Sequence, residues 1–119
     1  MLRIYGIKQC STMQKAFAWL DARNIAYTFH DYKKAGVEAQ TLRAWSDALG
    51  WQRLINTRGT TWRKLNDDQR AVSDAVAAIA LMQAHTSLIK RPILEGEGVL
   101  LTGFDESAWA DALKGFSHD

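Results

Sequence analysis

Cys10 is the residue from which chemistry is expected, because it is the only cysteine among the 119 residues of the chain. A strand-like segment precedes it and an apolar pattern typical of a helix follows it. Free backbone N–H groups and the positive end of the dipole at a helix N-terminus stabilise a thiolate, which is the nucleophilic form of cysteine. The alternative is a small, buried and inert apolar residue. The strand, loop, cysteine and helix arrangement favours a reactive thiol.

Two arginines are candidates to act beside this thiol. Arg91 precedes Pro92, the one proline of the chain, and Arg58 lies in the segment 56–60. The planar guanidinium group binds carboxylates and oxyanions through two donors and keeps its charge at every physiological pH. We therefore expect both arginines to hold an anion or a ligand carboxylate, with Lys8 as an additional positive charge. The alternative for each arginine is a solvated surface side chain.

A metal site and a nucleotide site are not expected. The histidines, His30, His85 and His118, show no paired spacing, and the acidic residues do not cluster as metal ligands would. A single cysteine also excludes an internal disulfide and a cysteine-rich metal centre. The glycines at 96 and 98 are typical of a hairpin and not of a phosphate-binding loop.

Length and composition indicate an ordinary globular chain. Hydrophobic residues make up 47% and charged residues 24%, and 119 residues favour one domain. Fifteen basic and 13 acidic residues leave a net charge of +2, which gives no reason to expect nucleic acid or a membrane as partner. The N-terminal segment lacks the apolar region of a signal peptide, and a single free thiol suits a reducing compartment. We expect a cytoplasmic location.

The first third of the chain predicts a β-α-β unit that would position Cys10. A strand over 2–5 ends at Gly6, and a second strand lies within 25–32. Between them, apolar residues recur at three- and four-residue steps, as on one face of a helix. Ser11 and Gln14 have the spacing of a capping box at the start of this helix.

The middle of the chain predicts helices. A turn over 33–36 precedes a helix from about residue 38 to 49, for which Gly50 is the C-terminal stop. The segment 51–65 is less regular and locally basic. One further helix is expected to run to about residue 84. Asn66 and Gln69 would form its capping box, and its apolar stripe would consist of Val72, Val76, Ile79 and either Met82 or Ala80.

The last third predicts an antiparallel strand pair and a helix. Strands at 93–94 and 99–101 would be joined by a four-residue connection, 95–98, and Asp105 would cap a final helix ending near Gly115. The order β-α-β, helices, β-β-α is that of an α/β, thioredoxin-like fold with a helical insertion between its two halves. We expect a single domain over 1–119 with the insertion at about 37–84.

Four segments together resemble the arsenate reductase family (ArsC/Spx), with the closest resemblance to its YffB branch. The segments are 5–10, 29–34, 56–65 and 88–93, and they occur in the same order as in the family and extend over nearly the whole chain. The resemblance implies a thioredoxin fold with a helical insertion, in agreement with the order of elements above.

The resemblance also implies roles for individual residues. It implies that Cys10 is the nucleophile. It also implies that Pro92 is a cis proline and that Arg91 is the arginine that precedes it in the family. A cis proline there would keep a strand edge open for the backbone of a peptide or of glutathione. Catalysis is therefore expected from Cys10, Arg91 and Arg58, and substrate binding from Lys8, Gln9, Ser11 and Pro92.

Three positions depart from the family's better-known branches. True arsenate reductases carry an arginine where this chain has Asn56, and a further arginine where it has Gly103. Both departures weigh against arsenate as the substrate. Spx-type regulators have a second cysteine where this chain has Met13, so a regulatory disulfide with Cys10 cannot form.

The expected activity is glutathione-dependent thiol-disulfide oxidoreduction with a single nucleophilic cysteine. Because the chain has no second thiol, glutathione or glutaredoxin would have to resolve the mixed disulfide. No bound cofactor is expected, and glutathione would be a co-substrate. Two alternatives remain: a non-catalytic Spx-like regulator that binds a protein partner such as RNA polymerase, and a glutaredoxin-linked arsenate reductase.

Overall fold

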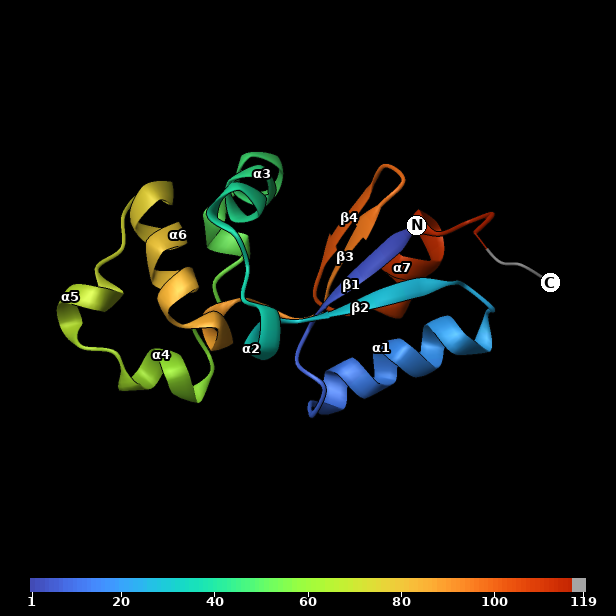
Figure 1. The fold of residues 1–119 in the computed structure, drawn as a ribbon, viewed down its shortest axis with the longest axis horizontal. Coiled ribbons are helices and arrows are strands. Elements are labelled where there is room, and N and C mark those ends of the chain that lie inside the picture. Colours follow the sequence, from blue (N-terminus) through green and yellow to red (C-terminus); the bar gives the residue numbers. More distant parts are fainter. Residues whose placement is uncertain (117–119) are drawn as a thin grey trace. The chain divides into compact units, whose positions relative to one another are not determined.

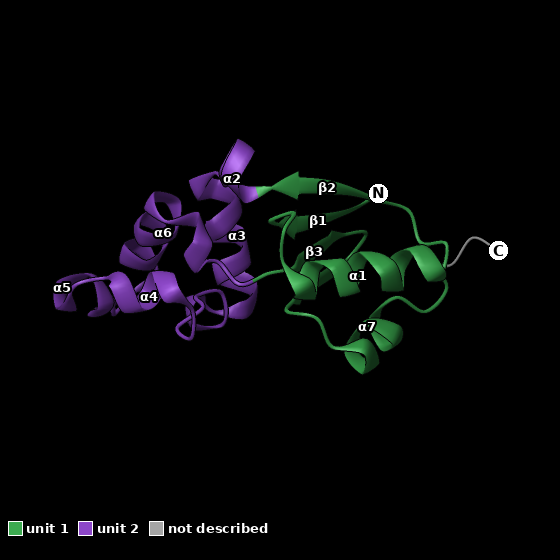
Figure 2. Ribbon diagram, turned by 90° about the horizontal axis from the view of Figure 1, so that it is seen from below, with its two compact units in different colours: residues 1–31, 91–119 green, residues 32–90 purple. Residues whose placement is uncertain are grey.

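The computed structural model describes residues 1–116, and the chain divides into two compact units (Figure 2). The first combines Met1–Asp31 with Arg91–Asp119, and the second is Tyr32–Lys90. The second unit holds the insertion that the sequence predicts between the halves of the sheet. Each unit is described below by itself.

The first unit contains a four-stranded mixed sheet. Its order is β2-β1-β3-β4, with β1 and β2 parallel and the other two pairs antiparallel. The strands are β1 (Leu2–Gly6), β2 (Tyr27–Asp31), β3 (Ile93–Gly96) and β4 (Val99–Thr102). This confirms the predicted α/β, thioredoxin-like fold, with β-α-β in the first half and β-β-α in the second.

Two helices, α1 (Ser11–Ala22) and α7 (Glu106–Ala112), cover one face of this sheet (Figures 1 and 2). Strand residues alternate between faces, so Leu2 and Ile4 point to the same side. The register places Ile4 beside Leu94, and all three side chains are buried in one cluster with α1 and α7. The helices supply Met13, Ala16, Trp19, Leu20 and Trp109 to that cluster, and Leu113, the residue after α7, adds to it.

The start of α1 differs from the prediction by one residue. Cys10 is the N-cap, with extended backbone (φ −148°, ψ 130°), and the helix begins at Ser11. Gln14 does not complete a capping box with Ser11. Its Nε2 donates instead to the carbonyl of Lys8, at 2.7 Å. Because Cys10 is the N-cap, Gln14 lies four residues after the cap, and its side chain turns back to the loop before the helix and not to Ser11. The predicted Ser11 cap is therefore wrong.

The hairpin connection is shorter than predicted. Glu95 and Gly96 continue the ladder opposite Leu100 and Val99, which leaves a two-residue turn. The turn residues Glu97 and Gly98 both have positive φ, 48° and 83°, as a type I′ turn requires. The predicted four-residue loop is wrong because the strand pairing extends to the turn itself.

The second unit is mostly helical, as the sequence predicts, and an isolated antiparallel bridge pairs Ile55 with Ile89. Its elements are α2 (Tyr32–Ala35), α3 (Ala39–Leu49), α4 (Thr60–Lys64), α5 (Asp67–Arg70) and α6 (Ala75–Ala84), with short 3-10 turns at Trp51–Arg53 and Thr86–Leu88. The predicted turn over 33–36 is instead largely the short helix α2. No helix among the described residues has the length and apolar character needed to cross a bilayer.

The predicted single helix up to residue 84 is divided in two. Asn66 and Gln69 do form a reciprocal capping box, but α5 ends at Arg70. Asp74 starts α6 by accepting from the N–H of Ala77 at 2.8 Å. Val76, assigned to the apolar stripe, is 66% exposed. A second strong N-cap therefore interrupts the pattern that predicted one helix.

Removing the cap of α7 should destabilise the first unit. Asp105 accepts hydrogen bonds from the N–H groups of Ser107 and Ala108, at 2.9 and 3.3 Å, at the start of the helix that carries buried Trp109. Asp105→Ala should lower the free energy of unfolding by about 1 kcal/mol, the typical value of an N-cap. Urea denaturation measures this. Asp111→Ala on the exposed side of the same helix is the control, and equal losses in both variants would contradict the capping role.

Candidate functional site

Cys10 lies at the junction between β1 and α1. β1 ends at Gly6, and the segment 7–10 leads directly into the first turn of the helix. Cys10 is half-buried and occupies the N-cap position. The predicted placement of the cysteine at a helix N-terminus is confirmed.

Several groups act on the Cys10 sulfur in opposite directions. Burial raises the pKa of the thiol, whereas the backbone N–H of Met13, the side chain of Arg91 and the backbone N–H of Thr12 lower it, helped by the charge of Arg91. The balance holds the pKa of Cys10 below its ordinary value. The neutral thiol makes no regular capping hydrogen bond, so these donors matter chiefly for the ionised form.

Arg91 is remote from Cys10 in the sequence, but its side chain acts on the Cys10 thiol. It lies immediately before Pro92 and β3, and the Arg91–Pro92 peptide bond is cis, as the resemblance implied. Pro92 is buried, and its carbonyl accepts from the N–H of Gly103 at 2.8 Å. The fold therefore brings Cys10, Arg91 and Pro92 together in one unit.

Gly6 and Met13 shape the floor of the site, and sequence reasoning did not identify them. A Cβ on Gly6 would overlap Sδ of Met13, lie 2.6 Å from its Cε and reach Cβ of Arg91 at 3.4 Å. Met13 is fully buried, and its backbone N–H acts on Cys10. Gly6, at the end of β1, thus lies close to both the side chain of Met13 from the first turn of α1 and Cβ of Arg91. Gly6, which ends the predicted first strand, was the available signal in the sequence.

The other predicted residues are placed less centrally. Lys8, Gln9 and Ser11 flank Cys10 with exposed side chains, and Lys8 contributes its carbonyl to the contact with Gln14. Arg58 is exposed in the second unit, where its N–H donates to Oδ1 of Asn56 at 3.1 Å. A role for Arg58 beside the thiol, and substrate binding by the three flanking residues, stay predictions.

Metal ligation has no support in the part of the chain that the structure describes. No three residues among histidine, cysteine, aspartate and glutamate gather there as a metal site would require. His118, considered as a ligand from the sequence, lies outside the described residues.

Comparison with known proteins identifies the family of this chain. The model of the ArsC family matches residues 5–112. The chain belongs to the ArsC family. The solved structure of a YffB protein is 50% identical to this ArsC-family chain, with a TM-score of 0.91, and the match covers 95% of this chain and 99% of the other.

Two further relatives extend the comparison. The solution structure of an arsenate reductase (ArsC) related protein from Brucella melitensis is 47% identical, with a TM-score of 0.73 and coverage of 95% and 94%. The global transcriptional regulator Spx of Staphylococcus saprophyticus is 30% identical over 110 residues, which cover 89% of this chain and 82% of Spx. The family thus includes relatives named both as reductase-like proteins and as regulators.

Gly6→Ala should disturb the site without touching the sulfur directly. The added methyl group must displace buried Met13, so we expect a loss of about 1–3 kcal/mol in the free energy of unfolding, as for an overpacked core. The pKa of Cys10 should rise, because displacement of Met13 shifts the first turn of α1, whose N–H groups lower that pKa. Urea denaturation and the pH dependence of iodoacetamide alkylation measure the two effects.

Met13→Ala supplies the matched control for this substitution. In the Gly6→Ala/Met13→Ala double variant the added methyl group has room, so the loss should be smaller than the sum of the two single losses. Strict additivity would show that the two residues do not compete for the same space.

Proposed function

We propose that this ArsC-family protein is a glutathione-dependent thiol-disulfide oxidoreductase with Cys10 as its single nucleophile. The observation that carries the proposal is the convergence of two helix N–H groups and Arg91 on the Cys10 sulfur, which favours the thiolate. A thiolate is both the attacking form and the better leaving form of cysteine. A buried structural cysteine would need no such surroundings.

The reaction proceeds in two exchange steps. The Cys10 thiolate attacks the glutathione sulfur of a mixed disulfide between glutathione and a substrate thiol. A bond forms between the two sulfurs, the original disulfide breaks, and the substrate leaves as a thiolate that takes a proton from water. A second glutathione thiolate then attacks the disulfide on Cys10, which releases oxidised glutathione and returns Cys10 as a thiolate.

Arg91 supports both steps through the same contact. Its guanidinium group stabilises negative charge on the Cys10 sulfur before attack and again when Cys10 leaves. The cis peptide bond between Arg91 and Pro92 immediately precedes β3. The backbone at Arg91 and Pro92 is the surface that we propose for the peptide backbone of glutathione.

Substitutions at the two residues test this mechanism. Cys10→Ser should abolish glutathione-linked reduction of a glutathionylated peptide, because the hydroxyl group is not a nucleophile at neutral pH. Arg91→Ala should slow turnover roughly ten- to a hundredfold, the equivalent of one hydrogen bond to a charged group. Arg91→Lys should retain part of the rate, and raising the pH should partly rescue Arg91→Ala. Unchanged turnover in both Cys10→Ser and Arg91→Ala would contradict the proposal.

A second candidate function is that of a regulator that binds a protein partner, favoured by the similarity to Spx over most of the chain. Purified RNA polymerase is the direct probe. Co-sedimentation of Cys10→Ser with the polymerase, together with no glutathione-linked turnover in the native protein, would favour the regulator. Turnover without co-sedimentation would favour the enzyme. Formation of arsenite from arsenate with glutathione and glutaredoxin in the same assay would identify an arsenate reductase instead.

A further inference from the structure

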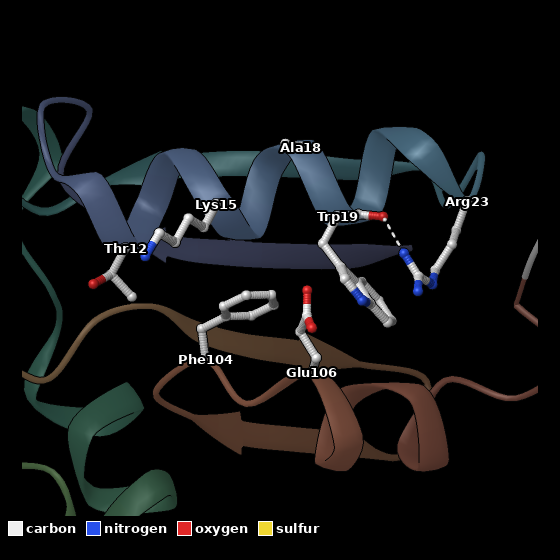
Figure 3. Close-up of a pocket in the computed structure, with 7 residues that line it drawn as sticks. All are labelled: Thr12, Lys15, Ala18, Trp19, Arg23, Phe104 and Glu106. Carbon is white, nitrogen blue, oxygen red and sulfur yellow. Dashed lines mark hydrogen bonds between the residues drawn. The ribbon is translucent and has the colours of Figure 1, made fainter.

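A pocket of about 710 Å³ opens along α1 on the side that faces the start of α7 (Figure 3). It is distinct from the contact between Cys10 and Arg91, and all its residues belong to the first unit. Its main lining residues are Thr12, Lys15, Trp19, Arg23, Phe104 and Glu106. The end of the pocket at Thr12 adjoins the site, since the N–H of Thr12 acts on the Cys10 sulfur.

Two oppositely charged side chains, Lys15 and Glu106, line this pocket and do not form an ion pair with each other. Lys15 extends from α1 back toward Thr12, and Glu106 points into the pocket from the first turn of α7 (Figure 3). Within residues 1–116, neither of these two side chains makes a hydrogen bond or an ion pair. Elsewhere on α7, Asp111 and Lys114 do pair, at 3.4 Å. The pocket therefore offers one unengaged cation and one unengaged anion.

The pocket also has a firm aromatic wall. Trp19 is buried, with its ring 6.3 Å from that of Phe104 in an edge-to-face arrangement. The guanidinium group of Arg23 stacks 3.9 Å over the Trp19 ring, and its Nη1 donates to the carbonyl of Trp19 at 3.4 Å. These contacts hold the rings of Trp19 and Phe104 and the guanidinium group of Arg23 together in the wall of the pocket.

We propose that this pocket binds an α-amino-acid head group, with its ammonium group at Glu106 and its carboxylate at Lys15. A ligand with only one charge would leave one of the two side chains unpaired. The inference rests on the proposed function in one respect: the γ-glutamyl end of glutathione carries such a head group. Binding there places the rest of the tripeptide toward the Thr12 end and Cys10.

Binding of S-methylglutathione tests the proposal without any thiol chemistry, because its sulfur is blocked. In an NMR titration of the native protein, the side-chain signals of Trp19 and Phe104 should shift. Glu106→Gln and Lys15→Gln should each weaken binding by roughly two- to fivefold, the range of a solvent-exposed ion pair. Asp111→Asn and Lys114→Gln are the controls of equal charge change and should leave the affinity unaltered.

N-acetyl-S-methylglutathione lacks the ammonium group and therefore tests whether that group binds at Glu106. It should bind the native protein more weakly than S-methylglutathione, and Glu106→Gln should remove that difference. Equal affinity of the two ligands for the native protein, or shifts confined to residues outside the pocket, would overturn the proposal. Turnover with no binding in the pocket would refute this inference alone, whereas binding in the pocket with no turnover would refute the proposed function alone.

Discussion

Burial of the Cys10 sulfur opposes its ionisation, and the first unit is arranged to reverse that effect. The thiol lies partly withdrawn from water, which alone would raise its pKa. Two helix N–H groups and one arginine outweigh this cost and hold the pKa below the ordinary value. Loss of any one of these donors would leave burial less opposed. The chemistry of a protein with a single thiol therefore depends on the position of the first turn of α1 and on Arg91.

The sheet supplies that position. Pairing of Tyr5 with Ile93 in the antiparallel β1–β3 ladder brings the end of the first strand beside the start of the third. A Cβ on Gly6, the next residue of β1, would lie 3.4 Å from Cβ of Arg91 and would overlap the side chain of Met13. The buried side chain of Met13 fills the space next to Gly6. Two segments that are remote in sequence thus become one site through backbone pairing and a single glycine.

Much of this could be predicted from the sequence because local patterns carry it. The strand, loop and helix around Cys10, the Asp105 cap and the hairpin each follow from residue types at short range. The predictions failed where two local signals competed. Ser11 and Gln14 suggested a capping box, whereas Cys10 occupies the N-cap position without a side-chain hydrogen bond. Asp74 starts a new helix within a pattern that predicted one continuous helix.

Other features depend on contacts that no local pattern contains. The meeting of Gly6, Met13 and Arg91 requires the β1–β3 register, and the pocket between α1 and α7 requires two helices packed on one face of the sheet. Arg91 and Pro92 became candidates through their residue types and the family resemblance, since their distance from Cys10 in the sequence gives no sign of proximity. The basic residue Arg58, equally prominent in the sequence, belongs to the other compact unit.

The central claim is that the folded first unit stabilises the Cys10 thiolate. The most direct measurement is the ultraviolet absorbance of that thiolate as a function of pH, in the native protein, in Arg91→Ala and in the protein unfolded in urea. We predict that the midpoint is lowest in the native protein, higher in Arg91→Ala and highest in urea. A native midpoint equal to or above that of the unfolded chain would contradict the account.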